Sequence, residues 1–79
     1  MRFYNEVKKG LCMAQILLNG EPFEIKEHCS IAQLLEQCQL TGQRLAVEIN
    51  QNIIPRSQFE QYFLQNNDKV EIVRAIGGG

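Results

Sequence analysis

Apolar and polar residues alternate over residues 14–19 and 22–27 with the two-residue period of a β-strand. The dipeptide NG between these stretches predicts a two-residue hairpin turn, because Asn and Gly both tolerate the positive φ that this turn needs. Such a turn sets the register by placing Leu18 opposite Glu21. The further pairs in this register, whose apolar members share one face, are Ile16 with Phe23 and Ala14 with Ile25.

The segment SIAQLLEQCQLTG predicts a helix with a defined start. Ser30 is placed to cap the first turn, and Gln33, three residues later, is placed to reach back and complete a capping box. Gly42 is expected to end the helix. The apolar residues that repeat at helical spacing, and that should pack on the sheet, are Ile31, Leu34, Leu35 and Cys38.

Alternation returns over residues 45–49, which predict a third strand, and a polar turn is expected at 50–52. A short extended piece then ends at the proline of the sequence IIP. Ser57 and Glu60 repeat the capping-box spacing, so we expect a brief helical turn there. The aromatic residues that this turn would carry inward are Phe59 and Phe63.

Residues 69–76 predict the last strand, which is apolar on both faces for part of its length, as is typical of a central strand. The order of elements describes an α+β domain with a β-grasp, ubiquitin-like fold. In it, one main helix packs on one face of a mixed sheet of about four to five strands. We expect this domain over residues 13–74, with a disordered or cloning-derived N-terminal arm over 1–12 and a flexible C-terminal tail over 75–79.

Length and charge exclude several classes of function. A chain of 79 residues forms one small domain, and such a domain buries only roughly 60% of its unfolded surface. An internal pocket of roughly 300–1,000 Å³ would remove much of that burial, so we do not expect an enzyme. Eight basic and nine acidic residues give a net charge of −1, and the basic residues do not cluster, which argues against nucleic acid.

The three cysteines, Cys12, Cys29 and Cys38, show no CxxC spacing, and the chain has neither a signal-peptide core nor a long apolar run. These features predict a reduced, cytoplasmic protein that is not bound to a membrane. His28-Cys29 is the only neighbouring His/Cys pair, and no second cluster completes a metal site. We interpret this pair as a surface loop with a free thiol, and the scattered glutamates as solvated surface.

The chain ends in Gly77, Gly78 and Gly79, directly after the predicted central strand. A glycine-rich end is often disordered. Flexible linkers, however, usually contain polar residues between their glycines, and none is present here. Residues without Cβ atoms fit a narrow channel, and residues 75–79 span at most roughly 17 Å. We therefore predict that this tail delivers its terminal carboxylate into the active site of another protein.

Residues 13–79 resemble the ThiS family of sulfur carrier proteins, which act in thiamine (thiazole) biosynthesis. The resemblance rests on the stretches ILLNGEPFEI, SIAQLLEQ, AVEINQNIIPRSQF and NNDKVEIV, and on the terminal Gly78-Gly79. Its most specific part is the segment Pro55-Arg56-Ser57 with Phe59. The Gly-Gly end by itself is shared with other ubiquitin-like carriers.

The resemblance implies that a ThiF-type enzyme adenylates the Gly79 carboxylate with ATP. Sulfur from a persulfide enzyme would then replace the adenylate, and the resulting thiocarboxylate would donate its sulfur to a ThiG-type thiazole synthase. The carrier would catalyse nothing, hold no metal or cofactor, and be a monomer when free. The sheet face near the tail should dock these enzymes. The residues expected to thread into partner sites are Gly77, Gly78, Ile76 and Ala75.

Two alternatives share the same kind of terminus. The small subunit of molybdopterin synthase, of the MoaD type, usually reaches its glycines through a proline-containing stretch, whereas VRAIGGG has no proline. The segment PRSQF is also foreign to that family. A ubiquitin-like modifier that conjugates its terminal glycine to lysines would use the same acyl-adenylate, so the tail alone leaves that alternative open.

Overall fold

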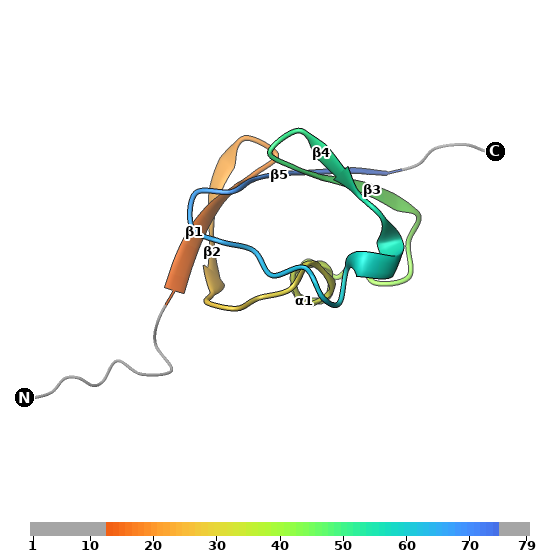
Figure 1. Ribbon diagram of the computed structural model, residues 1–79, viewed down its shortest axis with the longest axis horizontal. Helices are drawn as coiled ribbons and strands as arrows, with labels where there is room; N and C mark the ends of the chain where they lie inside the picture. The colour runs from red at the N-terminus through yellow and green to blue at the C-terminus, as the bar shows by residue number, and fades with distance from the viewer. Residues whose placement is uncertain (1–12, 75–79) are drawn as a thin grey trace, which may run out of the picture.

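The computed structural model describes residues 13–74; the predicted arm over 1–12 and the predicted tail over 75–79 lie outside the described residues. The described chain forms one five-stranded mixed sheet in the order β2-β1-β5-β3-β4, with the helix α1 on its concave face (Figure 1). The predicted α+β architecture is confirmed. The elements are β1 (Met13–Leu18), β2 (Glu21–Lys26), α1 (Ile31–Gln37), β3 (Leu45–Ile49), β4 (Asn52–Ile54), the 3₁₀ turn η2 (Arg56–Gln58) and β5 (Lys69–Arg74).

The hairpin β1–β2 has the predicted register. Leu18 pairs with Glu21 across the turn, and both turn residues have positive φ, 51° at Asn19 and 88° at Gly20. The other two predicted pairs are also present, and the face that they share points into the core. A two-residue turn fixes the register of the two strands, so only one set of alternate side chains, the apolar set, can face the core.

Helix α1 begins as predicted and ends earlier. The Ser30 side chain accepts a hydrogen bond from the Gln33 backbone N–H at 3.1 Å, and the Gln33 side chain accepts one from the Ser30 N–H at 2.9 Å, which completes the capping box. The expected stop at Gly42 is wrong. Gln39, with φ 62°, leaves the helix in the left-handed region, and Leu40 N–H bonds back to Leu35 C=O at 2.7 Å in a Schellman closure.

The helical turn after β4 also starts earlier than predicted. The turn η2 follows Pro55, and no side chain caps it, so the expected capping box at Ser57 and Glu60 is wrong. Phe59 is buried as predicted, whereas Phe63 is 52% exposed. Beyond η2 the chain becomes extended, so that Leu64, the neighbour of Phe63, points into the core instead.

Strand β5 is central, as its sequence predicted. It runs parallel to β1 on one side and antiparallel to β3 on the other, and the side chains of Val70 and Ile72 face α1. No described element covers the opposite, convex face of β5, β3 and β4 (Figure 1). The largest fully buried side chains of the core are Ile16, Ile25, Ile31, Leu34, Ile49, Val47 and Val70.

Candidate functional site

The candidate site begins where β5 leaves the sheet. Arg74 is the last described residue, and it pairs with Leu45 at the start of β3. The predicted site residues Gly77, Gly78 and Gly79, together with Ala75 and Ile76, lie outside the described residues. The structure therefore shows the base from which the tail departs, and this base is the middle strand of the sheet.

Asn19 supports β5 at the place where β1 stops. Strand β1 pairs with β5 only at Lys69 and Val70, because the chain turns away at Asn19. From there the Asn19 carboxamide continues the pairing: its Oδ1 accepts a hydrogen bond from Ile72 N–H at 2.8 Å, and its Nδ2 donates to Ile72 C=O at 3.4 Å. The side chain thus takes the place of the next peptide group of β1.

Asn50 hydrogen-bonds the backbone of β5 on its other side, next to β3. It also follows a strand and also has a positive φ of 52°. Its Oδ1 accepts from Lys69 N–H at 3.0 Å, its backbone N–H donates to Lys69 C=O at 2.8 Å, and its Nδ2 donates to Asp68 Oδ1 at 3.0 Å. Two turn asparagines therefore fix β5 along its length, a role that the sequence analysis did not assign to them.

We predict that replacing Asn19 with glycine loosens the end of β5 without unfolding the domain. Glycine keeps the positive φ but removes the acceptor for Ile72 N–H, and one such hydrogen bond is worth roughly 1 kcal/mol. Exchange of the Ile72 amide hydrogen, followed by NMR, should accelerate about fivefold for that loss. Asn19→Asp, which keeps the acceptor oxygen, is the control, and equal protection in wild type and Asn19→Gly would contradict the prediction.

Arg56, from the segment that carries the resemblance, holds the loop before β3. Its Nη2 donates to the backbone C=O of Gln43 at 2.9 Å. Gln43 lies two residues before Leu45, the partner of Arg74. Arg56 thus ties η2 to the same end of the sheet from which the tail departs.

A shallow apolar hollow lies at this end of the sheet, between β5 and the end of α1. Its volume is about 270 Å³, and Arg74 stands at its edge. The residues that line it include no His, Asp or Glu side chain. The residues that line it are Leu18, Asn19, Cys38, Leu40, Leu45, Ile72 and Arg74.

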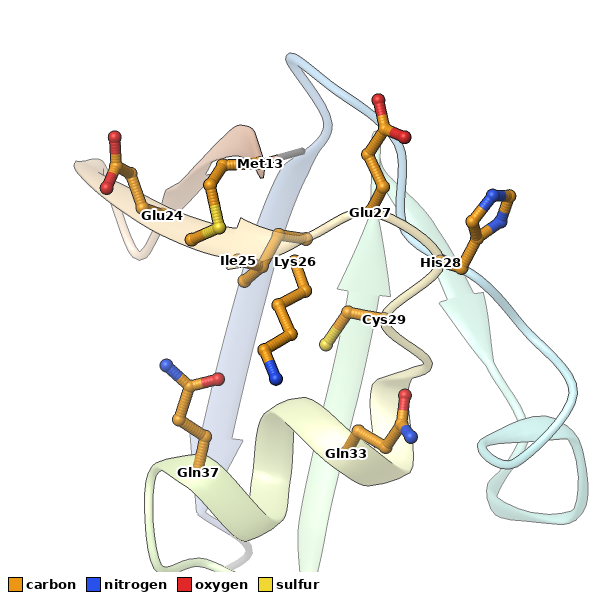
Figure 2. Close-up of a pocket in the computed structure, with 9 residues that line it drawn as sticks. All are labelled: Met13, Glu24, Ile25, Lys26, Glu27, His28, Cys29, Gln33 and Gln37. Atoms are coloured by element: carbon orange, nitrogen blue, oxygen red, sulfur yellow. The ribbon is translucent and has the colours of Figure 1, made fainter. Parts of the chain in front are cut away.

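A second hollow, of about 500 Å³, lies between the end of β2 and α1 (Figure 2). In it, the His28 ring points outward to solvent, whereas the Cys29 thiol points inward toward α1. Cys29 Sγ donates to Ser30 C=O at 3.5 Å. The two side chains therefore do not form a nucleophile–base pair.

Burial disfavours the thiolate form of the two described cysteines, Cys29 and Cys38. Burial, with a smaller contribution from Cys38, raises the pKa of the Cys29 thiol, and burial likewise raises the pKa of Cys38. The interpretation of Cys29 as a surface thiol is wrong, because Cys29 is buried in the core. Within residues 13–74, no three His, Cys, Asp or Glu side chains gather into a metal site. No described helix is long and apolar enough to cross a membrane.

Comparison with known proteins gives consistent matches. The model of the ThiS family matches residues 16–79. The sulfur carrier protein ThiS of Escherichia coli K12 is 34% identical over 65 residues, covering 82% of this chain and 98% of that protein. The uncharacterized protein ycf40 of Porphyra purpurea is 39% identical over 64 residues, covering 81% of this chain and 90% of that protein.

A solved structure and a longer protein add to these matches. The thiamine biosynthesis protein ThiS from Geobacter metallireducens has a TM-score of 0.72 and 25% identity, covering 82% of this chain and 99% of that one. The thiazole synthase of Paramagnetospirillum magneticum is 34% identical over 65 residues, which are 82% of this chain and 20% of that enzyme.

Proposed function

The chain belongs to the ThiS family of sulfur carrier proteins of thiamine biosynthesis, and from this premise we propose that its Gly79 carboxylate carries the sulfur as a thiocarboxylate. The observation that carries the proposal is the reach of the family match, which continues past the described strand β5 through all three glycines to residue 79. The fold supports it, because the strand that precedes the tail is the central strand of the sheet and is paired on both sides.

The chemistry requires activation of the carboxylate before sulfur can enter. A carboxylate is a poor electrophile, so one of its oxygens first attacks the α-phosphorus of ATP and displaces pyrophosphate, which leaves an acyl-adenylate. The terminal sulfur of a cysteine persulfide then attacks the acyl carbon and displaces AMP. A thiol cleaves the resulting acyl disulfide, and the thiocarboxylate and a new disulfide remain. These steps belong to partner enzymes, and the carrier supplies only the acceptor.

The carrier contributes position and reach. A bound thiocarboxylate replaces a scarce diffusing sulfide by a high effective concentration at the partner's active site. Asn50 holds the start of β5 at Lys69, and Asn19 holds the strand at Ile72, two residues before Arg74. Burial raises the pKa of the Cys29 and Cys38 thiols, which disfavours the nucleophilic thiolate.

Three kinds of partner follow from the proposal: a ThiF-type adenylating enzyme, a persulfide enzyme and a ThiG-type thiazole synthase. The last has support among the relatives. Two thiazole synthases, from Paramagnetospirillum magneticum and Magnetococcus marinus, match this chain over only 20% of their own length. A carrier-like segment within the synthase chain indicates that the two work together. All three encounters fit a monomeric carrier in the cytoplasm.

The proposal is tested by the intact mass of the protein after incubation with a ThiF-type enzyme, ATP and a persulfide donor. We expect a gain equal to one sulfur replacing one oxygen, located at Gly79 by fragmentation of the C-terminal peptide. The chain lacking Gly79 is the control and should show no gain, because its carboxylate ends one residue short of the reacting position.

Other outcomes would point elsewhere. Isopeptide-linked adducts in place of the sulfur gain would indicate a protein modifier. If the sulfur-loaded carrier restored activity to a molybdopterin synthase that lacks its own small subunit, but did not support thiazole formation, it would be a carrier of the MoaD type. Absence of any adenylation would refute the proposal.

A further inference from the structure

Two glutamates face each other on the convex side of the sheet. Glu48 of β3 is directly opposite Glu71 of β5. Val47 and Ile49 beside Glu48 and Val70 beside Glu71 are fully buried, and Ile72 is partly buried against the core. Because side chains alternate along a strand, both carboxylates must therefore point away from α1. Like charges placed directly opposite in an antiparallel pair destabilise the sheet. The domain thus keeps an arrangement that works against its own folding.

Exposed apolar side chains surround this carboxylate pair. Ile53 of β4, which is 70% exposed, lies directly opposite Glu48 on the other side. Val73 of β5, which is 57% exposed, is two residues beyond Glu71 and lies opposite the exposed Ala46. We call these five residues, Ala46, Glu48, Ile53, Glu71 and Val73, the convex patch. No described element covers it (Figure 1).

The convex patch is continuous with the start of the tail. Val73 is followed by Arg74 and then by the residues that lead to Gly79. The described cation on the same face of β5 is Lys69, which lies two residues from Glu71 on the side away from the tail. Arg44, which precedes β3, and Arg74, which ends β5, lie at the tail end of the sheet, and neither is in register with the two carboxylates.

We propose that the convex patch docks the enzyme that adenylates Gly79, and that this enzyme places an arginine or lysine between Glu48 and Glu71. One basic side chain there would relieve the repulsion between the two carboxylates, and the apolar side chains around it would exclude water from the contact. Excluding water strengthens such charge pairs, whereas the free carrier keeps both carboxylates solvated. This inference rests on the proposed function and specifies how its first partner recognises the carrier.

The proposal predicts opposite signs for stability and for binding, a pattern that a merely structural pair would not produce. Glu71→Gln and Glu48→Gln remove the repulsion, so the urea midpoint should stay the same or rise. The same variants should bind a ThiF-type enzyme about tenfold more weakly, the ratio that corresponds to roughly 1.4 kcal/mol. Ile53→Ala should also weaken binding severalfold without a change in the midpoint, because Ile53 packs little in the free domain.

The matched control is Glu24→Gln. Glu24 is exposed on β2 and points to the same side of the sheet as the convex patch, but it lies two strands away from β5. Its substitution changes the net charge by the same amount as Glu48→Gln or Glu71→Gln. Its dissociation constant should equal that of the wild type. Added salt should weaken binding of the wild type and of Glu24→Gln more than binding of the Glu48/Glu71 double variant.

The experiment is a titration of each full-length carrier with the ThiF-type enzyme in the absence of ATP, so the binding readout is independent of sulfur transfer. Tenfold weaker binding of the Glu48 and Glu71 variants, with Glu24→Gln unchanged, would support the convex patch. Equal affinity of all variants, equal weakening by Glu24→Gln, or no binding of the wild type would overturn it. The proposed function is judged separately, by the sulfur gain in intact mass.

Discussion

Replacing Gly78 with valine is expected to lower the rate of sulfur loading at Gly79 by at least about 100-fold, since misplacing a reacting group by about 1 Å can cost that much. A β-branched side chain widens the tail next to the reacting carboxylate and restricts its backbone, so the end group no longer fits a channel that accepts only glycine. The measurement is the initial rate of thiocarboxylate formation by intact mass, with the ThiF-type enzyme, ATP and persulfide donor in excess.

The effect should be confined to function. Glycine has no side chain to contribute to the core, so the urea midpoint of Gly78→Val should match that of the wild type. Gly77→Ala, which adds a single methyl group one residue further from the carboxylate, is the graded control and should lose less. Loading of Gly78→Val at the wild-type rate would show that the tail is not threaded through a narrow site.

Replacing Leu34 with alanine is expected to cost about 2–5 kcal/mol of the free energy of unfolding. Leu34 is fully buried between α1 and the sheet, so its removal loses apolar burial and leaves a cavity. At about 0.05–0.15 kcal/mol per residue, a chain of this length has a total stability of roughly 4–12 kcal/mol. The urea midpoint should therefore fall clearly, as followed by circular dichroism, and at the low end of this stability range the variant should unfold without urea.

Ile53→Ala provides the contrast within the same sheet. It removes an equally large aliphatic side chain that is 70% exposed, so its free energy of unfolding should change by less than about 0.5 kcal/mol. If Leu34→Ala proved as stable as Ile53→Ala, the packing of α1 on the sheet would have to be revised.

The parts of the fold that the sequence predicted correctly are those in which two local signals agree. The hairpin combines strict alternation with a two-residue turn, and together these allow only one register, the one observed. The start of α1 combines a capping residue with a glutamine at the right spacing, and both hydrogen bonds form. The apolar character of β5 on both faces indicated its central place, which the sheet order confirms.

The errors arose where backbone hydrogen bonds, one local and one between distant segments, overrode residue preference. Glycine is the usual residue at a helix end, yet Gln39 takes the left-handed conformation because the closure with Leu40 satisfies the last carbonyl groups of α1. Phe59 and Phe63 have helical spacing, but the chain straightens after η2 and bonds to the loop before α1, with Leu64 N–H donating to Cys29 C=O at 2.8 Å. In that extended segment the inward position falls on Leu64.

The sequence predicted one part of the candidate site, the tail, and did not predict the residues that support it. The terminal glycines drew attention to the tail because of what they lack, whereas its support depends on asparagines whose sequence context signalled turns alone. A carboxamide that replaces a peptide group of a neighbouring strand does not change the pattern of apolar and polar residues, so the sequence does not reveal it. The opposed glutamates were equally hidden, because the pairing of β3 with β5 depends on residues more than twenty positions apart.

The place of β5 also determines when this protein can fold during its synthesis. The hairpin β1–β2 and the hairpin β3–β4 touch the same strand, β5, and it is the last of the five to leave the ribosome. Until then each hairpin lacks its neighbour and the core between them cannot close. A chain whose translation stops before β5 is therefore expected to stay unfolded and sensitive to proteases, so incomplete chains would not accumulate as folded carriers that lack the tail.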